Sequence, residues 1–459
     1  MVLAAETPIV GTGKDYTHLV QDYRVHGSLY TDPAVFADEM KRIFTDGWVF
    51  VGHESEIPNG GDWVARRLGS ERVLMARTPE GEISVVANRC AHRGTTLCPQ
   101  SEGNNRNFRC PYHAWTYALD GTLLGAPFPQ GFRNGKPDVC LDQPGQIGIY
   151  RGFVFANQSG TAGPLSEHLG PGGSDLLDRA ADMSPTGRLQ LNGGWIGQRV
   201  DSNWKMWPES DNDGYHIIFA HESLASSLLA GSQYEDVILE GEGRTKSVAR
   251  DYGGGHVELD FRKSYTTELA WLGAPRGKVS AYCDDLEDAY GVEKAKSIMW
   301  DGPPHAFVFP NLFLGEMNIA RIDPLAPGLT EHHHTPLLVE TSDPGINRRV
   351  VLQSEAAMGP ASFFLPEDVV IAERMHRAFD VGGATDPHGH TERGWVELGR
   401  GIDREQSGGG QRWGDVTDET TSRGFWHHYR CVMSGSATSG PAEGNGAAPP
   451  NGSSGNGQG

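Results

Sequence analysis

Hydrophobic residues near the N-terminus recur at the spacing of an amphipathic helix. Phe36, Met40 and Phe44 stand four residues apart, so they share one face of a helix. Asp32 precedes this run, and its side chain can accept a hydrogen bond from an unpaired backbone N–H at the start of a helix. The pattern therefore predicts a helix over residues 31–47.

Downstream of this helix the pattern changes to short hydrophobic runs separated by turns that contain glycine. These runs predict strands over residues 63–68, 72–77, 83–88 and 152–156. We therefore expect residues 46–157 to form a small all-β domain that follows an N-terminal segment.

The rest of the chain divides into a second domain and a tail, while the N-terminal segment covers residues 1–45. Residues 158–175 are rich in glycine, serine and proline, which is typical of a linker. This linker opens a mixed domain of helices and strands over residues 158–433, with one clear helix predicted over 366–379. Residues 434–459 have no aromatic or branched aliphatic side chain, so we expect them to be disordered.

The composition is that of a folded protein and excludes several classes of function. Hydrophobic residues make up 37% of the 459 residues, and 61 further residues are glycine. The 59 acidic residues outnumber the 39 basic ones and give a net charge of −20, which argues against broad binding to nucleic acid or to an anionic membrane. No apolar run is long enough to span a membrane, and residues 1–11 do not resemble a signal peptide. A cytoplasmic protein is expected.

Two of the six cysteines occur in a repeated pairing with histidine. Cys90-Ala-His92 is followed, after seventeen residues, by Cys110-Pro-Tyr-His113. Two loops that each offer one thiolate and one imidazole suit a Rieske [2Fe–2S] cluster, which needs two thiolates on one iron and two imidazoles on the other. A structural zinc site uses the same donors, but it usually pairs like ligands along the chain. We therefore predict a [2Fe–2S] cluster, with zinc as the alternative.

Position 95 separates two kinds of Rieske protein. Rieske proteins of respiratory complexes have an extra, disulfide-bonded cysteine three residues after the histidine of the first loop, whereas this chain has Thr95. The motif therefore resembles the disulfide-free Rieske domains of oxygenases and their ferredoxins. Cys98 lies outside this pattern, and we interpret it as a structural thiol.

A second group of candidate ligands lies in the segment from Glu209 to His221. Two histidines five positions apart, His216 and His221, differ by about 140° on a regular helix. They could share a metal only if the helix broke or tightened between them. Asp213 and His216 are three apart and can share a face. Beside a Rieske cluster, two histidines and a carboxylate would form the facial triad of non-haem Fe(II) oxygenases, which leaves positions open for O2.

The carboxylate of such a triad must come from elsewhere in the chain. Asp368 is the best candidate, in the first turn of the predicted helix 366–379. An acid at this position is also favoured by the helix dipole alone, so the spacing leaves its role open. Glu367 is the next candidate.

Together these motifs resemble those of the large (α) subunits of Rieske-type aromatic-ring-hydroxylating dioxygenases, from about residue 30 to residue 430. The segment 209–216, Glu-x-x-x-Asp-Gly-Tyr-His, is close to the pattern of the benzoate, anthranilate and toluate branch. The segments Ile346-Asn-Arg-Arg349, Gly359-Pro-Ala361 and Pro366-Glu-Asp368 are similar to those of p-cumate and phthalate-type enzymes.

The resemblance implies the roles of several residues. Asp368 matches the carboxylate ligand of the family, so His216, His221 and Asp368 would hold a mononuclear Fe(II). Asp213 matches the aspartate that links a Rieske histidine of one subunit to an iron histidine of the next, here His113 and His216. Such a head-to-tail contact requires a closed ring of subunits, most simply a trimer.

The resemblance also implies the fold, the reaction and the partners. We expect an α+β protein with an all-β Rieske domain and a catalytic domain, whose curved antiparallel sheet is flanked by helices, with the 31–47 helix packed on it. The implied reaction adds both atoms of O2 to an aromatic ring and gives a cis-dihydrodiol. The sequence has no convincing G-x-G-x-x-G dinucleotide fingerprint, so electrons from NAD(P)H would arrive through a separate reductase. A ferredoxin and a small (β) subunit are further expected partners.

The substrate is predicted from the motif resemblance alone, which favours an aromatic carboxylate. A carboxylate should need a buried cation such as an arginine. Ile217, Met358 and Phe364 are the candidates to line a mostly apolar pocket, although each also fits an ordinary core position. Ser210 and the segment Ala361-Ser-Phe363 depart from the usual residues of the family near this pocket.

Two other functions stay open. Monooxygenation or O-demethylation is the alternative within the family. An electron-transfer protein with the Rieske centre alone is an alternative of a different class, but it would need neither the second metal site nor the large second domain. The run His332-His-His334 resembles a metal-binding tract, yet alternate residues of a strand point to opposite faces, so we expect no metal there.

Overall fold

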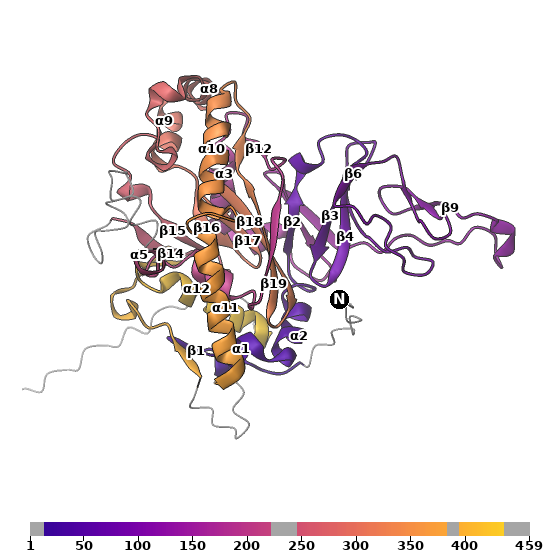
Figure 1. The fold of residues 1–459 in the computed structure, drawn as a ribbon, viewed down its shortest axis with the longest axis horizontal. Helices are drawn as coiled ribbons and strands as arrows, with labels where there is room; N and C mark the ends of the chain where they lie inside the picture. The colour runs from indigo at the N-terminus through magenta and orange to yellow at the C-terminus, as the bar shows by residue number, and fades with distance from the viewer. Residues whose placement is uncertain (1–12, 222–245, 383–393, 436–459) are drawn as a thin grey trace, which may run out of the picture.

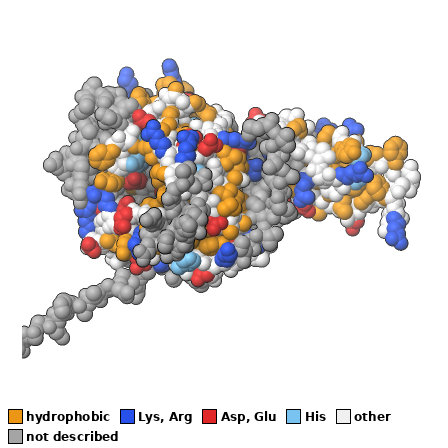
Figure 2. Space-filling view, turned by 60° about the horizontal axis from the view of Figure 1, so that its bottom comes forward, with side chains coloured by type: hydrophobic (Ala, Val, Ile, Leu, Met, Phe, Trp, Pro, Cys, Tyr) orange, Lys and Arg blue, Asp and Glu red, His pale blue; other side chains and the backbone are white. Residues whose placement is uncertain are grey.

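The computed structural model describes residues 13–221, 246–382 and 394–435. A narrow all-β lobe projects from a larger region in which helices cover an antiparallel sheet (Figures 1 and 2). The predicted α+β class is therefore confirmed. Within the described residues, no helix is both long and apolar enough to cross a membrane. The tail predicted to be disordered, residues 434–459, lies outside the described residues beyond position 435.

Three antiparallel sheets build the N-terminal lobe, with strand orders β10-β11-β2, β5-β4-β3-β6 and β7-β8-β9. The four strands predicted in this region are confirmed to within one residue, as β3, β4, β5 and β11. The strands are β2 (Val49–His53), β3 (Asp62–Leu68), β4 (Glu71–Arg77), β5 (Ile83–Ala87), β6 (Glu102–Asn104), β7 (Phe108–Arg109), β8 (Thr116–Tyr117), β9 (Leu123–Gly125), β10 (Gln146–Tyr150) and β11 (Phe153–Asn157).

Strand β4 is apolar on both faces because it separates two cores. Leu74 and Ala76 pack inside the lobe with Trp63. Val73 and Met75 point the other way and join the main core of the larger region. The alternation of side chains along a strand thus joins the lobe to the rest of the molecule through apolar contacts.

A nine-stranded antiparallel sheet forms the centre of the larger region, in the order β13-β19-β18-β17-β16-β15-β14-β23-β22. Two short pairs, β1 with β21 and β12 with β20, lie outside it. The strands are β1 (Arg24–His26), β12 (Leu189–Gln190), β13 (Ile196–Val200), β14 (Val248–Asp251), β15 (Val257–Asp260), β16 (His305–Val308), β17 (Leu312–Gly315), β18 (Asn318–Ala326), β19 (Leu329–Pro336), β20 (Leu338–Val339), β21 (Trp395–Glu397), β22 (Gln406–Gly408) and β23 (Gln411–Asp415).

Helices flank this sheet, and α10 and α11 run one after the other along it (Figure 1). The helix predicted over 366–379 is confirmed as α11, which is longer than predicted. The helices are α1 (Ser28–Thr31), α2 (Pro33–Arg42), α3 (Leu165–Asp182), α4 (Met206–Asp211), α5 (Ile217–Ala220), α8 (Ser280–Tyr290), α9 (Val292–Asp301), α10 (Pro344–Met358), α11 (Leu365–Gly382) and α12 (Thr420–Ser434).

The N-terminal helix is shorter than predicted but packs where the resemblance implies. Asp32 caps α2, its Oδ1 accepting a backbone N–H at 2.7 Å. The helix ends at Arg42 because the next turn widens: Phe44 N bonds to Glu39 O, five residues back, at 3.2 Å. Phe44 continues the apolar face, and its ring lies 5.2 Å from that of Trp204 in the main core.

A helix occupies part of the segment predicted to be a linker. α3 begins at Leu165, inside the range 158–175, and bends at Gly170 (φ 55°), which Pro171 follows. Glycine reaches positive φ without strain, and proline suits the first turn of a new helical segment. Leu169 is buried in a core beneath this bend. The linker prediction is therefore wrong from residue 165 onward, because residues that usually break helices here form a kink in a packed one.

Candidate metal centres

Two loops of the N-terminal lobe bring the first motif together. Cys90 and His92 follow β5, and Cys110 and His113 lie between β7 and β8. In each loop the cysteine carbonyl accepts a hydrogen bond from the backbone N–H four residues further along, at 2.8 and 3.0 Å. The two loops therefore close by the same tight turn and present their ligand side chains in corresponding positions.

In the folded lobe the two cysteines lie together and the two histidines lie together. The buried thiols of Cys90 and Cys110 contact each other, and the ring centroids of His92 and His113 lie 4.7 Å apart. His92 stacks on Trp115, and its Nδ1 is buried without a hydrogen-bond partner among the described residues. Within the described ranges, no three of the ligand atoms of these four residues all lie within 4.8 Å of one another. One thiolate pair and one imidazole pair fit the two irons of a Rieske cluster better than a single zinc.

A tyrosine that the motif analysis missed also reaches the cysteines. Tyr117 Oη lies 3.2 Å from Cys90 Sγ. Burial and the neighbouring thiol raise the pKa of Tyr117 above its ordinary value, so the hydroxyl stays protonated and can donate to a thiolate. No spacing in the sequence indicates this contact, because β8 brings Tyr117 to the loops. Cys98 is half-buried, and burial raises its pKa to about 11, as expected of an unreactive structural thiol.

Replacing Cys110 with alanine is expected to abolish the visible absorption of the purified protein, because one iron loses one of its two anionic ligands. The absorption spectrum and the content of iron and acid-labile sulfide measure this effect. Cys98→Ala is the matched control and should keep the full spectrum. An unchanged spectrum in the Cys110→Ala protein would show that the cluster is held elsewhere.

The second motif lies where the helical conformation is interrupted. α4 ends at Asp211, and α5 is a single turn with His216 directly before it and His221 directly after it. At His221 the backbone leaves the helical region, with φ −100° and ψ 47°. This interruption turns both imidazoles to the same side, which a regular helix would not allow. The break that the five-residue spacing requires is therefore present.

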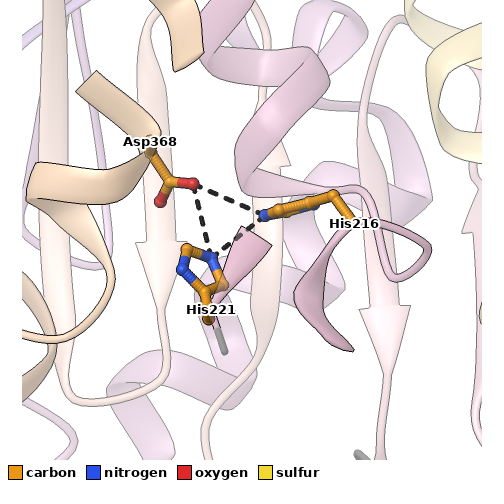
Figure 3. A group of neighbouring side chains, drawn as sticks. All are labelled: His216, His221 and Asp368. Atoms are coloured by element: carbon orange, nitrogen blue, oxygen red, sulfur yellow. Dashed lines mark hydrogen bonds and ion pairs between the residues drawn. The ribbon is translucent and has the colours of Figure 1, made fainter. Parts of the chain in front are cut away.

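His216, His221 and Asp368 converge between α5 and the start of α11 (Figure 3). The two Nε2 atoms lie 3.2 Å apart, and Asp368 Oδ1 lies 3.5 Å from that of His216 and 3.3 Å from that of His221. One ion could contact all three atoms at the usual distance of about 2.0–2.2 Å. Asp368 Oδ1 is buried without a hydrogen-bond donor in the described part of the chain. The residues therefore fit the two-histidine, one-carboxylate donor set of non-haem Fe(II).

Each imidazole of this triad has a second carboxylate at its other nitrogen. Asp213 Oδ2 lies 3.3 Å from His216 Nδ1, and Glu367 Oε2 lies 2.8 Å from His221 Nδ1. Burial alone would lower the pKa of His216, but Asp213 and Asp368 outweigh burial and raise it to about 10. The site thus favours positive charge between these groups. Carboxylates placed in this way orient metal-binding imidazoles.

Glu209, the first residue of the second motif, has a structural role. Glu209 accepts hydrogen bonds from Tyr30 Oη at 2.8 and 2.9 Å and from Trp426 Nε1 at 2.6 Å. Burial raises the pKa of Glu209 to about 7. Lys205 and Glu39 form a fully buried ion pair of 2.5 Å one turn away. These contacts tie α4 to α1, α2 and α12, and so position the segment that carries the candidate ligands.

The three residues proposed to line the substrate pocket have different surroundings. The ring of Phe364 meets that of His221 edge-on, with centroids 4.8 Å apart. Met358 is buried in the main core at the end of α10. Ile217 is half-buried next to His216 in the chain. Phe364 is therefore the candidate with a direct contact to the triad.

The histidine tract alternates on β19 as predicted. His332 and His334 are buried on one face, and His333 is half-buried on the other. His333 Nε2 lies 3.6 Å from a carboxylate oxygen of both Asp323 and Glu331. Both acids already pair with arginines, at 3.0 and 2.7 Å. The group is thus an ion-pair network and does not require a metal.

Comparison with known proteins places these two sites in one family. Residues 47–136 match the Rieske [2Fe-2S] domain, and residues 178–405 match the catalytic domain of the ring hydroxylating alpha subunit. The chain is 30% identical over 430 residues to the N,N-dimethyl phenylurea N-demethylase subunit alpha of Sphingobium sp. (strain YBL2), covering 87% of this chain and 89% of that protein. It is 29% identical over 389 residues to the toluate 1,2-dioxygenase subunit alpha of Pseudomonas putida, covering 82% and 83%.

The fold agrees with these sequence matches. The solved structure of naphthalene 1,2-dioxygenase from Rhodococcus sp. matches 90% of this chain and 95% of that chain, with a TM-score of 0.74 and 24% identity. The fold and the sites thus define an oxygenase with a Rieske domain and a mononuclear iron domain. The chain belongs to the family of Rieske aromatic-ring-hydroxylating dioxygenase alpha subunits, which are oxidoreductases that receive electrons from NAD(P)H through a reductase.

Proposed function

We propose that this chain is the terminal oxygenase of a multicomponent system and adds both atoms of O2 to the ring of an aromatic carboxylate. The reaction consumes the arene, O2, NAD(P)H and a proton, and it gives a cis-dihydrodiol and NAD(P)+. The triangle of His216, His221 and Asp368, in a chain that also has the paired cysteine and histidine loops, carries this proposal. The likeness to a toluate dioxygenase supports an aromatic acid as the substrate.

The residues of the chain hold and orient both metal centres in this proposal. The [2Fe–2S] ligands are Cys90, His92, Cys110 and His113, and the iron ligands are His216, His221 and Asp368. When bound, the cluster supplies single electrons and the iron activates O2. Glu367 accepts a hydrogen bond from Nδ1–H of His221 and thereby orients Nε2 toward the other two ligands. Phe364 covers the edge of the same ring with apolar surface.

Electrons pass between neighbouring subunits in this proposal. Asp213 would link His113 of one subunit to His216 of the next, because one of its oxygens already faces His216 Nδ1. The N-terminal lobe projects from the catalytic domain (Figure 2), and Tyr112 and Phe128 on it are exposed apolar side chains suited to a protein contact. A trimer-based assembly would satisfy this head-to-tail contact. A reductase, a ferredoxin and a small (β) subunit are the proposed partners.

N-demethylation is a second candidate function. The relative that is 30% identical over 87% of this chain is named a phenylurea N-demethylase. That reaction would insert one oxygen atom into an N-methyl group, release formaldehyde and reduce the other oxygen atom to water. Both reactions use the same two metal centres, so the substrate pocket decides between them.

Product analysis with isotopic oxygen distinguishes these functions. The reconstituted system would receive benzoate, the toluate isomers, anthranilate, toluene and N,N-dimethyl phenylurea under 18O2. We expect diols that carry two 18O atoms from the aromatic acids. Formaldehyde from the urea, without any diol, would instead establish demethylation. Diols from toluene alone would contradict the choice of an aromatic acid.

A further inference from the structure

Several buried nitrogen atoms on one face of the catalytic sheet have no hydrogen-bond partner among the described residues. Neither ring nitrogen of His332 is bonded, and His334 Nδ1, Trp207 Nε1 and Gln198 Nε2 are also unpartnered. His332, Trp207 and His334 are 0%, 1% and 2% exposed. Because buried polar groups are almost always paired in folded proteins, this concentration of unpaired nitrogens points to a binding site for a hydrogen-bond acceptor.

These four side chains lie together. His332 pairs with Gln198 across strands β19 and β13, so both face the same side of the sheet. The ring centroid of Trp207 lies 4.5 Å from that of His332, and that of His334 lies 6.1 Å from it. We call Gln198, Trp207, His332 and His334 the β19 cluster.

One member of the β19 cluster lies on a helix that packs against the helix carrying Asp368. Trp207 lies on α4, which contacts α11, the helix that carries Asp368. Trp207 also shares one hydrophobic core with Met358 and Leu365, and Leu365 is the first residue of α11. α10 also contacts β19. The cluster is therefore a polar patch whose Trp207 belongs to the same hydrophobic core as the first residue of α11.

The unpaired atoms form a set dominated by donors. An indole N–H and an amide NH2 can only donate, and a neutral imidazole supplies one N–H. Burial, followed by the neighbouring histidines, lowers the pKa of His332 well below its ordinary value, so this imidazole is neutral on its own. A carboxylate has two oxygens that each accept more than one hydrogen bond. It would satisfy several of these donors at once and would favour protonation of an adjacent imidazole.

We propose that the β19 cluster binds the carboxylate of the aromatic substrate and thereby selects aromatic acids over neutral aromatics. This inference rests on the proposed function and identifies the residues that recognise its substrate. Histidines and an indole take the place of the expected arginine. Arg321, on the neighbouring strand, shares the register of His333 and faces the other side, where it pairs with Asp323 at 3.0 Å.

Binding measurements on the holoenzyme test the proposal. Benzoate and benzamide have the same shape but differ in charge, and calorimetric titration gives the affinity of each. His332→Leu should weaken benzoate binding by about 10- to 100-fold, the effect of losing a hydrogen bond to a charged group, and should affect benzamide less. Trp207→Phe removes the N–H but keeps an aromatic ring, and it should weaken benzoate binding in the same direction. His333→Leu, on the opposite face of β19, is the matched control and should leave benzoate affinity unchanged.

A proton count adds a readout that a purely structural role would not change. Titrations in two buffers of different ionisation enthalpy should show that the native protein takes up a proton with benzoate and that His332→Leu does not. The fold of each variant is verified by its iron content, its Rieske spectrum and its Tm. If His332→Leu does not fold, the benzoate affinity of Trp207→Phe tests the proposal. Benzoate binding of native strength in the folded variants would overturn the inference while the proposed reaction stood. Binding of neutral aromatics but of no aromatic acid by the native protein would overturn the proposed substrate class itself.

Discussion

Replacing Asp368 with alanine should give a protein that keeps the visible Rieske spectrum, loses its mononuclear iron and hydroxylates no substrate. The carboxylate lies 3.3 and 3.5 Å from the two imidazole nitrogens, and without it a divalent cation would have two neutral ligands and no anionic one. The proposed [2Fe–2S] ligands lie in the N-terminal lobe and should be unaffected. Metal analysis before and after anaerobic addition of Fe(II), together with product formation, measures the outcome.

Glu367→Gln is the control for this experiment, because the two acids are neighbours on α11. Glu367 Oε2 contacts His221 Nδ1, on the opposite side of the ring from the triad. Its amide should still orient the imidazole, so iron binding should weaken by no more than about 10- to 100-fold and turnover should persist at saturating iron. If Asp368→Ala turned over normally and Glu367→Gln did not, the ligand roles of these two residues would be reversed.

Asp213→Asn should retain both metal centres and lose nearly all turnover, by at least about 100-fold. The ligands of both centres remain, so spectra and iron content should match those of the native protein. Turnover should fall because an amide cannot accept hydrogen bonds from both imidazoles in the way a carboxylate can, so the proposed link between the Rieske histidine and His216 would be lost. Reduction of the cluster followed by rapid mixing with O2 and substrate would show whether electrons still leave it.

Asp403→Asn provides the comparison for Asp213→Asn. Asp403 is an exposed acid in a surface hollow of about 590 Å³ that Tyr215, two residues from Asp213, also lines. The Asp403→Asn substitution should leave turnover unchanged. This comparison separates the loss of a specific link from the loss of one surface charge. Sizing of the active protein completes the test, because a fully active monomer would contradict transfer between subunits.

Local features of the chain could be predicted well from the sequence. The strands of the N-terminal lobe depend on alternation and on turn residues close in the chain, and they agree with the prediction to within one residue. The capping of α2 by Asp32 and the interruption between His216 and His221 also follow from short spacings. The limit of the same reasoning is visible in α3, where glycine and proline indicate a linker but tertiary packing keeps a kinked helix.

Contacts between segments far apart in the chain could not be predicted from the sequence and were seen only in the tertiary structure. Asp368 and Glu367 are both acids in the first turn of one helix, and their side chains point about 100° apart. The packing of α11 against the segment after α4 decides that Asp368 meets both Nε2 atoms and that Glu367 meets the far nitrogen of His221. Tyr117 beside Cys90 is another such contact, because strand pairing places it there.

The sequence by itself therefore determined the type of each metal centre, the order of the two domains and the histidines proposed as ligands, because the spacing within each loop is a local property. The tertiary structure decided which carboxylate lies within reach of both imidazoles, which carboxylates contact their other nitrogens, and that His332, beside Trp207, has no hydrogen-bond partner in the described part of the chain. These outcomes depend on how helices and strands far apart in the chain pack together. Packing is set by the sum of many weak contacts over the whole core, which no short pattern of residues contains.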